Sequence, residues 1–253
     1  MQKRTGRGEW IYGRRPVGEV FAAGRRQVYE LAMAAEDRES IEQTQFHECA
    51  TKAGAFFRQV TKRELDTISG DGNHQGVAVR VSAFPYISID EVCAEVRENE
   101  RVLILILDHL VDPQNLGSLM RTADAAGVQA VIIPENRAAA ITPAVVRASA
   151  GAAEHMRVAK VVNLVRSLND LKEAGLWVVG LATGGEGVRN YTEIDFKGRI
   201  GIAVGSEGHG LKRLTRETCD FVARLPMEGA VASLNASIAG AICMYEAVRQ
   251  RNA

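Results

Sequence analysis

The stretch RVLILIL (residues 101 to 107) is apolar without interruption from Val102 to Leu107. A strand with one face in solvent alternates apolar and polar residues, so this run predicts a strand inside a parallel sheet. Similar strands are predicted further along the chain, with helical stretches between them. The strands are expected at 130–134, 177–182, 199–205 and 221–226, and the helices at 116–126, 143–152 and 163–174. This alternation predicts an α/β domain with helices on both sheet faces, whose ligands bind at the carboxyl ends of the strands.

The chain before this strand lacks a comparable apolar run, and its mixture of short helical and strand patterns predicts a small α+β domain. Pro16 is expected to open a short helix that Gly24 closes, and Thr61 with Glu64 forms a capping-box pattern. Strands are expected at 28–33 and within 74–81, and a helix at 39–54. The predicted organisation is a basic flexible N-terminus at 1–9, a small domain at 10–82, a linker with one amphipathic helical segment at 83–100, and the second domain at 101–253.

Composition excludes several classes of protein. No run of about 18 apolar residues is present, so we expect no membrane-spanning helix. The first ten residues, MQKRTGRGEW, lack the apolar core of a signal peptide. The four cysteines lie far apart, without CxxC or zinc-ligand spacing, which predicts reduced thiols, a cytoplasmic location and no metal site.

The formal net charge is zero, but the N-terminal part is basic. Its cations are Lys3, Arg4, Arg7, Arg14, Arg15, Arg25 and Arg26. Such an arm is either a phosphate-binding surface or a solvated terminus, and this feature alone leaves both open.

Two glycine-containing loops follow predicted strands. In LDHLVDPQNLGSLMRTADAAG (107–127), Asn115 is expected to cap a helix that starts at Leu116, and Arg121 lies within that helix. In VGSEGHGL (204–211), the small residues let the backbone approach a ligand, and Glu207 lies inside the turn. Each loop alone is equally consistent with a purely structural role.

A third segment, LPMEGAVASLNAS (225–237), introduces the last helix. Ser233 and Asn235 are placed to cap it or to bind an electron-rich ligand at its start. Its apolar face is expected at Leu234, Ile238, Ala241, Ile242 and Tyr245.

Two common nucleotide sites are excluded by spacing. After Gly205 and Gly210, the residues Leu211-Lys212 stand where a P-loop requires Lys-Ser/Thr. No GxGxxG follows the first strand, which argues against a dinucleotide-binding dehydrogenase. The segment ATGGEG (182–187) is a further glycine turn at a strand end.

Together, DPQNLGSLMRTADAAG, GSEGHGL and LPMEGAVASLNASIAGAICMYEA resemble the three ordered motifs of the SpoU/TrmH family. This family comprises RNA ribose 2′-O-methyltransferases of the SPOUT superfamily. The resemblance is strongest over 100–253, while IYGRRPVGEVFAAG and HQGVAVRV are similar to the small RNA-binding domain of the bacterial 23S rRNA (guanosine-2′-O)-methyltransferase branch. It implies a C-terminal deep trefoil knot, S-adenosylmethionine (SAM) bound in the knot, and a homodimer with sites near the subunit interface.

The resemblance also assigns roles to residues. The family assigns the arginine that matches Arg121 to the loss of the hydroxyl proton, often as a base. Because arginine itself stays protonated, we expect Arg121 instead to grip the phosphate beside the reacting ribose and to stabilise developing alkoxide charge. Asn115 and Glu207 would orient Arg121, while Ser233 and Asn235 would fix the loop around the methyl group. The cofactor-binding residues implied are Thr183, Gly184, Ile202, Gly205, Leu225, Met227, Ser233 and Leu234. RNA contacts are expected at Arg14, Arg15, His74 and Gln75, although His74 could instead simply shape a turn.

Two alternatives stay open at this point. One is a tRNA ribose 2′-O-methyltransferase of the same family, and the other is a non-catalytic RNA-binding protein that retains the fold. The separate N-terminal domain favours 23S rRNA over tRNA, and the presence of Asn115, Arg121, Glu207 and Asn235 favours an enzyme.

Overall fold

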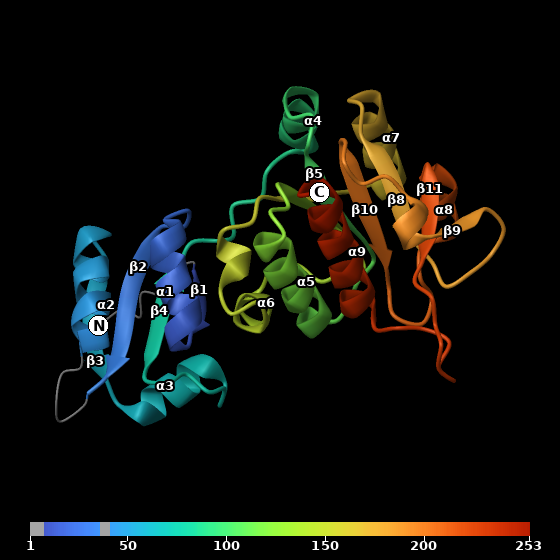
Figure 1. Ribbon diagram of the computed structural model, residues 1–253. Coiled ribbons are helices and arrows are strands. Elements are labelled where there is room, and N and C mark those ends of the chain that lie inside the picture. Colours follow the sequence, from blue (N-terminus) through green and yellow to red (C-terminus); the bar gives the residue numbers. More distant parts are fainter. Residues whose placement is uncertain (1–7, 36–40) are drawn as a thin grey trace. The chain divides into compact units, whose positions relative to one another are not determined.

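The computed structural model describes residues 8–35 and 41–253, which form two compact units (Figure 1). Unit 1 contains the chain up to Pro85 together with Ile141–His155, and unit 2 contains Tyr86–Ala140 together with Met156–Ala253. Lys3, Arg4 and Arg7 of the predicted basic arm, most of the predicted flexible N-terminus at 1–9, and the start of the predicted helix at 39–54 lie outside the described residues.

Unit 1 is built on a four-stranded sheet in the order β1-β4-β2-β3, in which only β2 and β3 run parallel. Its elements are β1 (Glu9–Tyr12), α1 (Arg14–Ala23), β2 (Val28–Ala34), α2 (Ile41–Lys52), β3 (Phe56–Val60), α3 (Lys62–Ser69), β4 (Val77–Val81), α6 (Pro143–Ala148) and the 3-10 helix η1 (Ala152–Glu154).

Local sequence signals set the ends of two helices in unit 1. Helix α1 ends at Gly24, whose φ of 61° is left-handed, as predicted, but it begins at Arg14, two residues before the Pro16 that was expected to open it. At the start of α3, the Thr61 hydroxyl accepts the Glu64 N–H at 3.2 Å. The reciprocal half of the predicted capping box is replaced, because the Glu64 carboxylate pairs with Arg58 instead.

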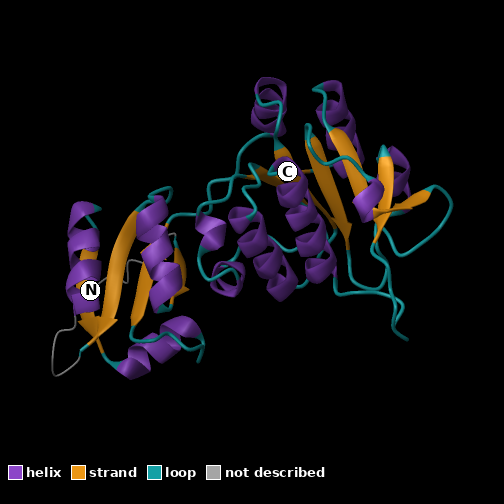
Figure 2. Ribbon diagram, in the orientation of Figure 1, coloured by secondary structure: helices purple, strands orange, loops and turns teal. Residues whose placement is uncertain are grey.

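Unit 2 is built on a seven-stranded, wholly parallel sheet in the order β7-β6-β5-β10-β8-β11-β9. Helices and loops surround its strands (Figure 2). Its elements are α4 (Ile89–Glu98), β5 (Leu103–Asp108), α5 (Pro113–Ala125), β6 (Ala130–Pro134), β7 (Val158–Val161), α7 (Leu164–Glu173), β8 (Trp177–Leu181), β9 (Val188–Asn190), the 3-10 helix η2 (Tyr191–Glu193), β10 (Ile200–Gly205), α8 (Arg213–Thr218), β11 (Phe221–Arg224) and α9 (Ala236–Arg251). The α/β class and the central position of the RVLILIL strand are confirmed.

Helices cover both faces of this sheet. Ile104 and Ile106 of β5 pack with α4 and α7, which contribute Val92 and Leu168 to the same core. On the other face α9 lies against β10 and beside α5 (Figure 1). Gly240 permits that packing, because a Cβ there would lie 2.6 Å from Leu119 of α5. The trefoil knot that the resemblance implies stays a prediction.

The boundaries of the units differ from the expected domains. Residues 86–100 were expected in a linker, yet they belong to unit 2, because α4 buries Val92, Cys93 and Val96 in its core. Residues 141–155 were expected inside the second domain but belong to unit 1, where α6 contacts β1 and η1 contacts α1. Strands β1, β3, β7 and β9 were not predicted, since each is short and lacks a long apolar run.

Two expectations about helices are wrong. Helix α5 begins at Pro113 and is capped by Asp112, whose carboxylate accepts the Gln114 N–H at 2.9 Å, so Asn115 lies inside the helix. The predicted apolar face of α9 is not its buried face: Ile238 and Tyr245 are each 51% exposed. The small side chains of Gly240, Cys243 and Ala247 allow close packing of the opposite face.

A buried ion-pair network in unit 1 yields a stability prediction. The Arg26 side chain is fully buried and donates to Glu154 at 3.1 Å, to Glu9 at 2.7 Å and to the Ser82 carbonyl. An Arg26→Ala substitution would leave Glu154 buried without its cation, which costs about 3–5 kcal/mol in unfolding free energy. Arg58→Ala, which removes a partly exposed pair, is the control and should cost within about 1 kcal/mol in urea unfolding.

The loss in the Arg26→Ala protein should depend on pH. Burial raises the pKa of Glu154, and the Arg26 guanidinium opposes that rise. Without Arg26 the pKa of Glu154 in the folded state lies further above its unfolded value, so folding keeps Glu154 protonated over a wider pH range. The loss in unfolding free energy relative to wild type therefore grows as pH increases through that folded-state pKa. A deficit that is equal at pH 5 and pH 8 would contradict this account.

Candidate active site

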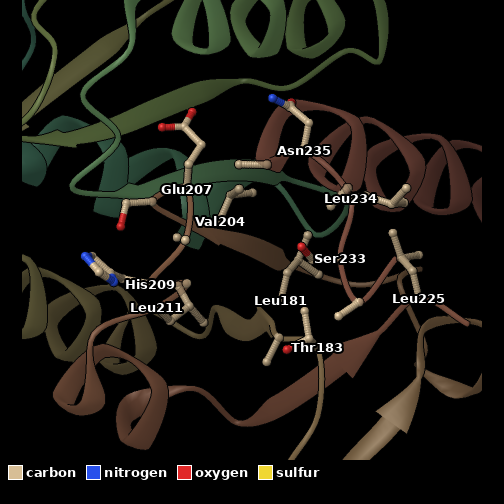
Figure 3. Close-up of a pocket in the computed structure, with 18 of the residues that line it drawn as sticks. Leu181, Thr183, Val204, Glu207, His209, Leu211, Leu225, Ser233, Leu234 and Asn235 are labelled. Carbon is tan, nitrogen blue, oxygen red and sulfur yellow. The ribbon is translucent and has the colours of Figure 1, made fainter. Parts of the chain in front are cut away.

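A pocket of about 550 Å³ lies at the carboxyl ends of β8, β10 and β11 (Figure 3). Three loop segments line it, and these are the strand-end segments that the sequence marked. They are Leu181 to Thr183, Val204 to Leu211, and residues between Ala223 and Ala239. The pocket therefore occupies the edge at which parallel sheets bind ligands.

The loop after β10 is a tight glycine turn. Ser206 and Gly210 exchange two backbone hydrogen bonds, at 3.1 and 2.9 Å, which close the turn. A Cβ built on Gly205 would lie 2.0 Å from the carbonyl carbon of Gly210, so only glycine can stand at this position. The backbone is thereby exposed to the pocket without an intervening side chain.

Asn115, Glu207 and Asn235 form one hydrogen-bonded network. The Asn235 Oδ1 accepts the N–H groups of Ser237 at 2.8 Å and Ile238 at 3.4 Å, so Asn235 caps α9. Its Nδ2 is then the donor to Asn115 Oδ1, at 2.9 Å. The Asn115 Nδ2 in turn donates to the carboxylates of Asp112 and Glu207. The network joins all three sequence motifs at the end of the pocket where Figure 3 shows Glu207 and Asn235.

Arg121 lies outside this network. It follows Asn115 by about one and two-thirds turns of α5, which directs its side chain to a different face of the helix. Arg121 is exposed, and within residues 8–35 and 41–253 its side chain has no hydrogen-bond or ion-pair partner. Asn115 and Glu207 were expected to orient Arg121, but in this chain they contact each other instead. The guanidinium is thus available to an incoming anion.

The pocket contains most of the residues that were expected to bind the cofactor. Those that line it are Thr183, Gly205, Leu225, Met227, Ser233 and Leu234. Gly184 follows the lining segment, and its carbonyl accepts a hydrogen bond from Arg216 at 3.0 Å. Ile202 is fully buried within β10 and does not line the pocket, because it lies too far from the carboxyl end of the strand. Arg216 lines the pocket and was not predicted, since it lies in a short charged helix.

A second cavity, of about 600 Å³, lies in unit 1. Its lining includes Arg14, Arg15 and Gln75, which were expected to contact RNA. It also includes Arg147 of α6, whose guanidinium lies 5.2 Å from the centre of the Tyr12 ring and bonds the Tyr12 hydroxyl. Sequence reasoning missed Arg147, because it lies far along the chain in a segment assigned to the other domain.

His74 has a structural role in this part of unit 1. Its Nδ1 accepts the Gly76 N–H at 3.0 Å, and its Nε2 lies 3.1 Å from Asp66 Oδ1. Both ring nitrogens are therefore used within the chain, and the imidazole shapes the turn before β4. The ring edge still borders a small cavity with Arg14 and Lys62.

Other features of the described chain bear on its chemistry. Burial raises the pKa of Cys219 and of Cys243 to about 12, so these free thiols stay protonated at neutral pH. Within the described ranges, no group of three or more His, Cys, Asp or Glu residues is arranged to hold a metal ion. None of the helices in this part of the chain is long and apolar enough to cross a membrane.

Relatives of the chain share nearly its whole length. YacO of Bacillus subtilis strain 168, a candidate tRNA/rRNA methyltransferase of the TrmH family, is 42% identical over 96% of each chain. The 23S rRNA (guanosine-2′-O-)-methyltransferase RlmB of Xanthomonas campestris pv. campestris is 40% identical over 96% of this chain and 97% of its own.

Solved structures share the fold. An AdoMet-bound rRNA methyltransferase from Sinorhizobium meliloti superposes with a TM-score of 0.80 at 26% identity, over 96% of this chain and 87% of that one. The SpoU methyltransferase AviRb from Streptomyces viridochromogenes, in complex with AdoMet, superposes with a TM-score of 0.82 at 25% identity, over 97% and 91%.

Family matches account for both parts of the sequence. Residues 10–87 match the RNA 2′-O ribose methyltransferase substrate-binding family. Residues 102–245, which hold the pocket and its polar network, match the SpoU rRNA methylase family. With relatives about 40% identical along its length, this chain belongs to the SpoU rRNA methylase family.

Proposed function

We propose that this protein transfers a methyl group from S-adenosylmethionine to a ribose 2′-hydroxyl of RNA, with a guanosine of 23S rRNA as the target. The observation that carries the proposal is the pocket at the strand ends, where all three family motifs meet in one polar network. The RlmB relative, named for 23S rRNA guanosine methylation, supports the substrate. A ribosomal RNA substrate supports a cytoplasmic location as part of this proposal.

The pocket suits an adenosyl cofactor in size and in chemistry. The apolar side chains of Leu181, Leu225 and Leu234 can pack against the adenine and ribose. Backbone groups of the glycine turn and of the segment before α9 can supply directional hydrogen bonds. Bound there, SAM supplies an electrophilic methyl group on a sulfonium centre.

Arg121 carries the catalytic role in this proposal. With SAM held by the pocket residues, the nucleophile would be the ribose 2′-hydroxyl, whose oxygen would lose its proton and bond the methyl carbon as the carbon–sulfur bond breaks and S-adenosylhomocysteine leaves. The exposed guanidinium binds the adjacent phosphate through two hydrogen bonds and stabilises the developing alkoxide. The phosphate or water accepts the proton, because arginine remains protonated. Asn115, Glu207 and Asn235 hold the three loops together. Ser233 lines the pocket and lies near Leu181 and Thr183 (Figure 3).

The substrate is tested by comparing RNAs side by side. Labelled SAM is incubated with the protein and with unmodified 23S rRNA, 16S rRNA or bulk tRNA. Label on 23S rRNA alone supports the proposal. Label on tRNA alone would support RNA methylation but contradict 23S rRNA as the substrate. Label on no RNA would favour a non-catalytic RNA-binding protein.

The arginines of unit 1 give a prediction about RNA affinity. Arg15 and Arg147 are exposed and line one cavity, and among the described residues no carboxylate lines it with them. Arg15→Ala and Arg147→Ala should each weaken RNA binding and reduce the slope of log affinity against log salt concentration by about one. Lys52→Ala, on the exposed end of α2 beside β3, is the control. Equal loss in the control would indicate nonspecific charge effects.

A second copy of this chain is the proposed partner of the exposed face of α9. Ile238 and Tyr245 of α9 are each 51% exposed and lie seven residues apart, about two turns along the same helix face. Tyr245→Asp should convert a homodimer into a monomer in light scattering, because it introduces a charge into an apolar interface. Val162→Asp, at a 78% exposed valine after β7, should leave the dimer intact. A monomeric wild-type protein would contradict the assignment.

A further inference from the structure

Asp108 is a buried acid that the proposed mechanism does not use. It is the last residue of β5, its side chain is fully buried, and it does not line the pocket. Its Oδ2 accepts the backbone N–H of Lys212 at 2.7 Å, and its Oδ1 accepts the Nδ1–H of His109 at 2.6 Å. A buried carboxylate lowers the stability of the fold unless it is hydrogen-bonded. A position with no role for the acid would therefore favour an apolar residue.

The two ends of the glycine turn both meet at Asp108. Strands β5 and β10 run parallel in a register that places Gly205, the first residue of the turn, opposite Asp108. Lys212, directly after the turn, is held by the Asp108 side chain. Between these two points lie Gly205 to Leu211, every one of which lines the pocket. Asp108 therefore holds both ends of the turn. Its strand pairs with the start of the turn at Gly205, and its carboxylate binds the residue that follows the turn, Lys212.

His109 completes this arrangement. Its φ of +58° is unusual for a residue with a side chain, and this backbone turns the imidazole back toward Asp108. The imidazole is 22% exposed, whereas the carboxylate that it contacts is fully buried. A local backbone conformation of this kind persists where surrounding contacts determine it. The Asp108–His109 pair thus fixes the direction of the carboxylate that holds Lys212.

We propose that Asp108 is a positioning residue, which holds the turn 205–212 in the shape that binds the cofactor and presents Glu207 to Asn115. The proposal rests on the proposed function, because the cofactor of that function occupies the pocket. Asp108 touches neither cofactor nor RNA in this scheme. Its effect reaches them through the backbone of Lys212 and the closed turn.

The test compares substitutions at two aspartates of the same sheet. Asp108→Ala removes the side-chain oxygens that hold Lys212 and His109. Asp108→Asn keeps an amide oxygen that can accept the Lys212 N–H, and its amide N–H can donate to His109 Nδ1 when the imidazole carries its proton on Nε2. Asp220→Ala is the matched control. Asp220 also holds a backbone N–H, that of Val178 at 2.9 Å, but at the amino ends of the strands. SAM affinity is measured by calorimetry at a temperature where each variant is folded.

Asp108→Ala should weaken SAM binding tenfold or more, with Asp108→Asn within about threefold of wild type and Asp220→Ala within about twofold. Amide exchange at 206–212 should accelerate in Asp108→Ala and not in Asp220→Ala. Wild-type affinity in folded Asp108→Ala, or an equal loss in Asp220→Ala, would overturn the proposal. A wild-type protein that fails to bind SAM would instead overturn the proposed function, and the exchange rates would still decide whether Asp108 clamps the turn.

Discussion

A Gly205→Ala protein is expected to lose S-adenosylmethionine binding by about 100-fold or more. The added Cβ would lie 2.0 Å from the carbonyl carbon of Gly210 and 2.2 Å from the Leu211 nitrogen. Real Cβ atoms do not approach backbone so closely, so the turn must open and the Ser206–Gly210 hydrogen bonds must break. The loop that carries Glu207 would move with it.

Gly198→Ala provides the matched control. Gly198 precedes the amino end of the same strand, β10, and a Cβ there meets no atom within 4 Å. Calorimetric titration should show wild-type affinity for this control. A folded Gly205→Ala protein that binds SAM normally would show that the turn does not contact the cofactor, and the assignment of the pocket would be lost.

An Arg121→Ala protein should bind SAM normally and transfer methyl groups about 10²–10³-fold more slowly. Binding is spared because Arg121 does not line the pocket. Catalysis suffers because the alkoxide and its neighbouring phosphate lose their cation. Arg121→Lys should recover only part of the rate, since lysine restores the charge without the two-pronged guanidinium.

Arg213→Ala controls for loss of surface charge. Arg213 is exposed on α8 and pairs with Glu217 one turn away. Single-turnover methylation with saturating SAM compares the proteins directly. An Arg121→Ala rate equal to that of Arg213→Ala would remove Arg121 from the mechanism.

Apolar runs were sufficient to predict the central sheet. The RVLILIL run became β5, with strands on both sides, because only the interior of a parallel sheet accommodates such a sequence. Strand β7 escaped prediction because its four residues, VAKV, contain an exposed lysine. The start of α5 was misplaced because Asn115 was expected to be its cap, although an aspartate cap followed by proline at the first helical position is common.

Those residues of the site that lie in a recognisable local sequence pattern could be predicted. The glycine turn and the Asn-containing motif singled out Gly205, Glu207 and Asn235, which line the pocket, while their roles stay predictions. Contacts between segments distant along the chain left no local signal. Arg147 reaches the cavity of unit 1 from residues 141–155, and Asp108 reaches Lys212 across the sheet. The exposed face of α9 was misjudged because an apolar stripe predicts burial without saying against what.

The most direct test of the central claim is the chemical position of the transferred methyl group. Methylated 23S rRNA is digested to nucleosides, and the products are identified by mass spectrometry, with alkaline cleavage used to map the site. We predict 2′-O-methylguanosine at one nucleotide, where the neighbouring phosphodiester resists alkali because the 2′-oxygen is blocked. A methyl group on a base, with normal alkaline cleavage at that nucleotide, would contradict the account.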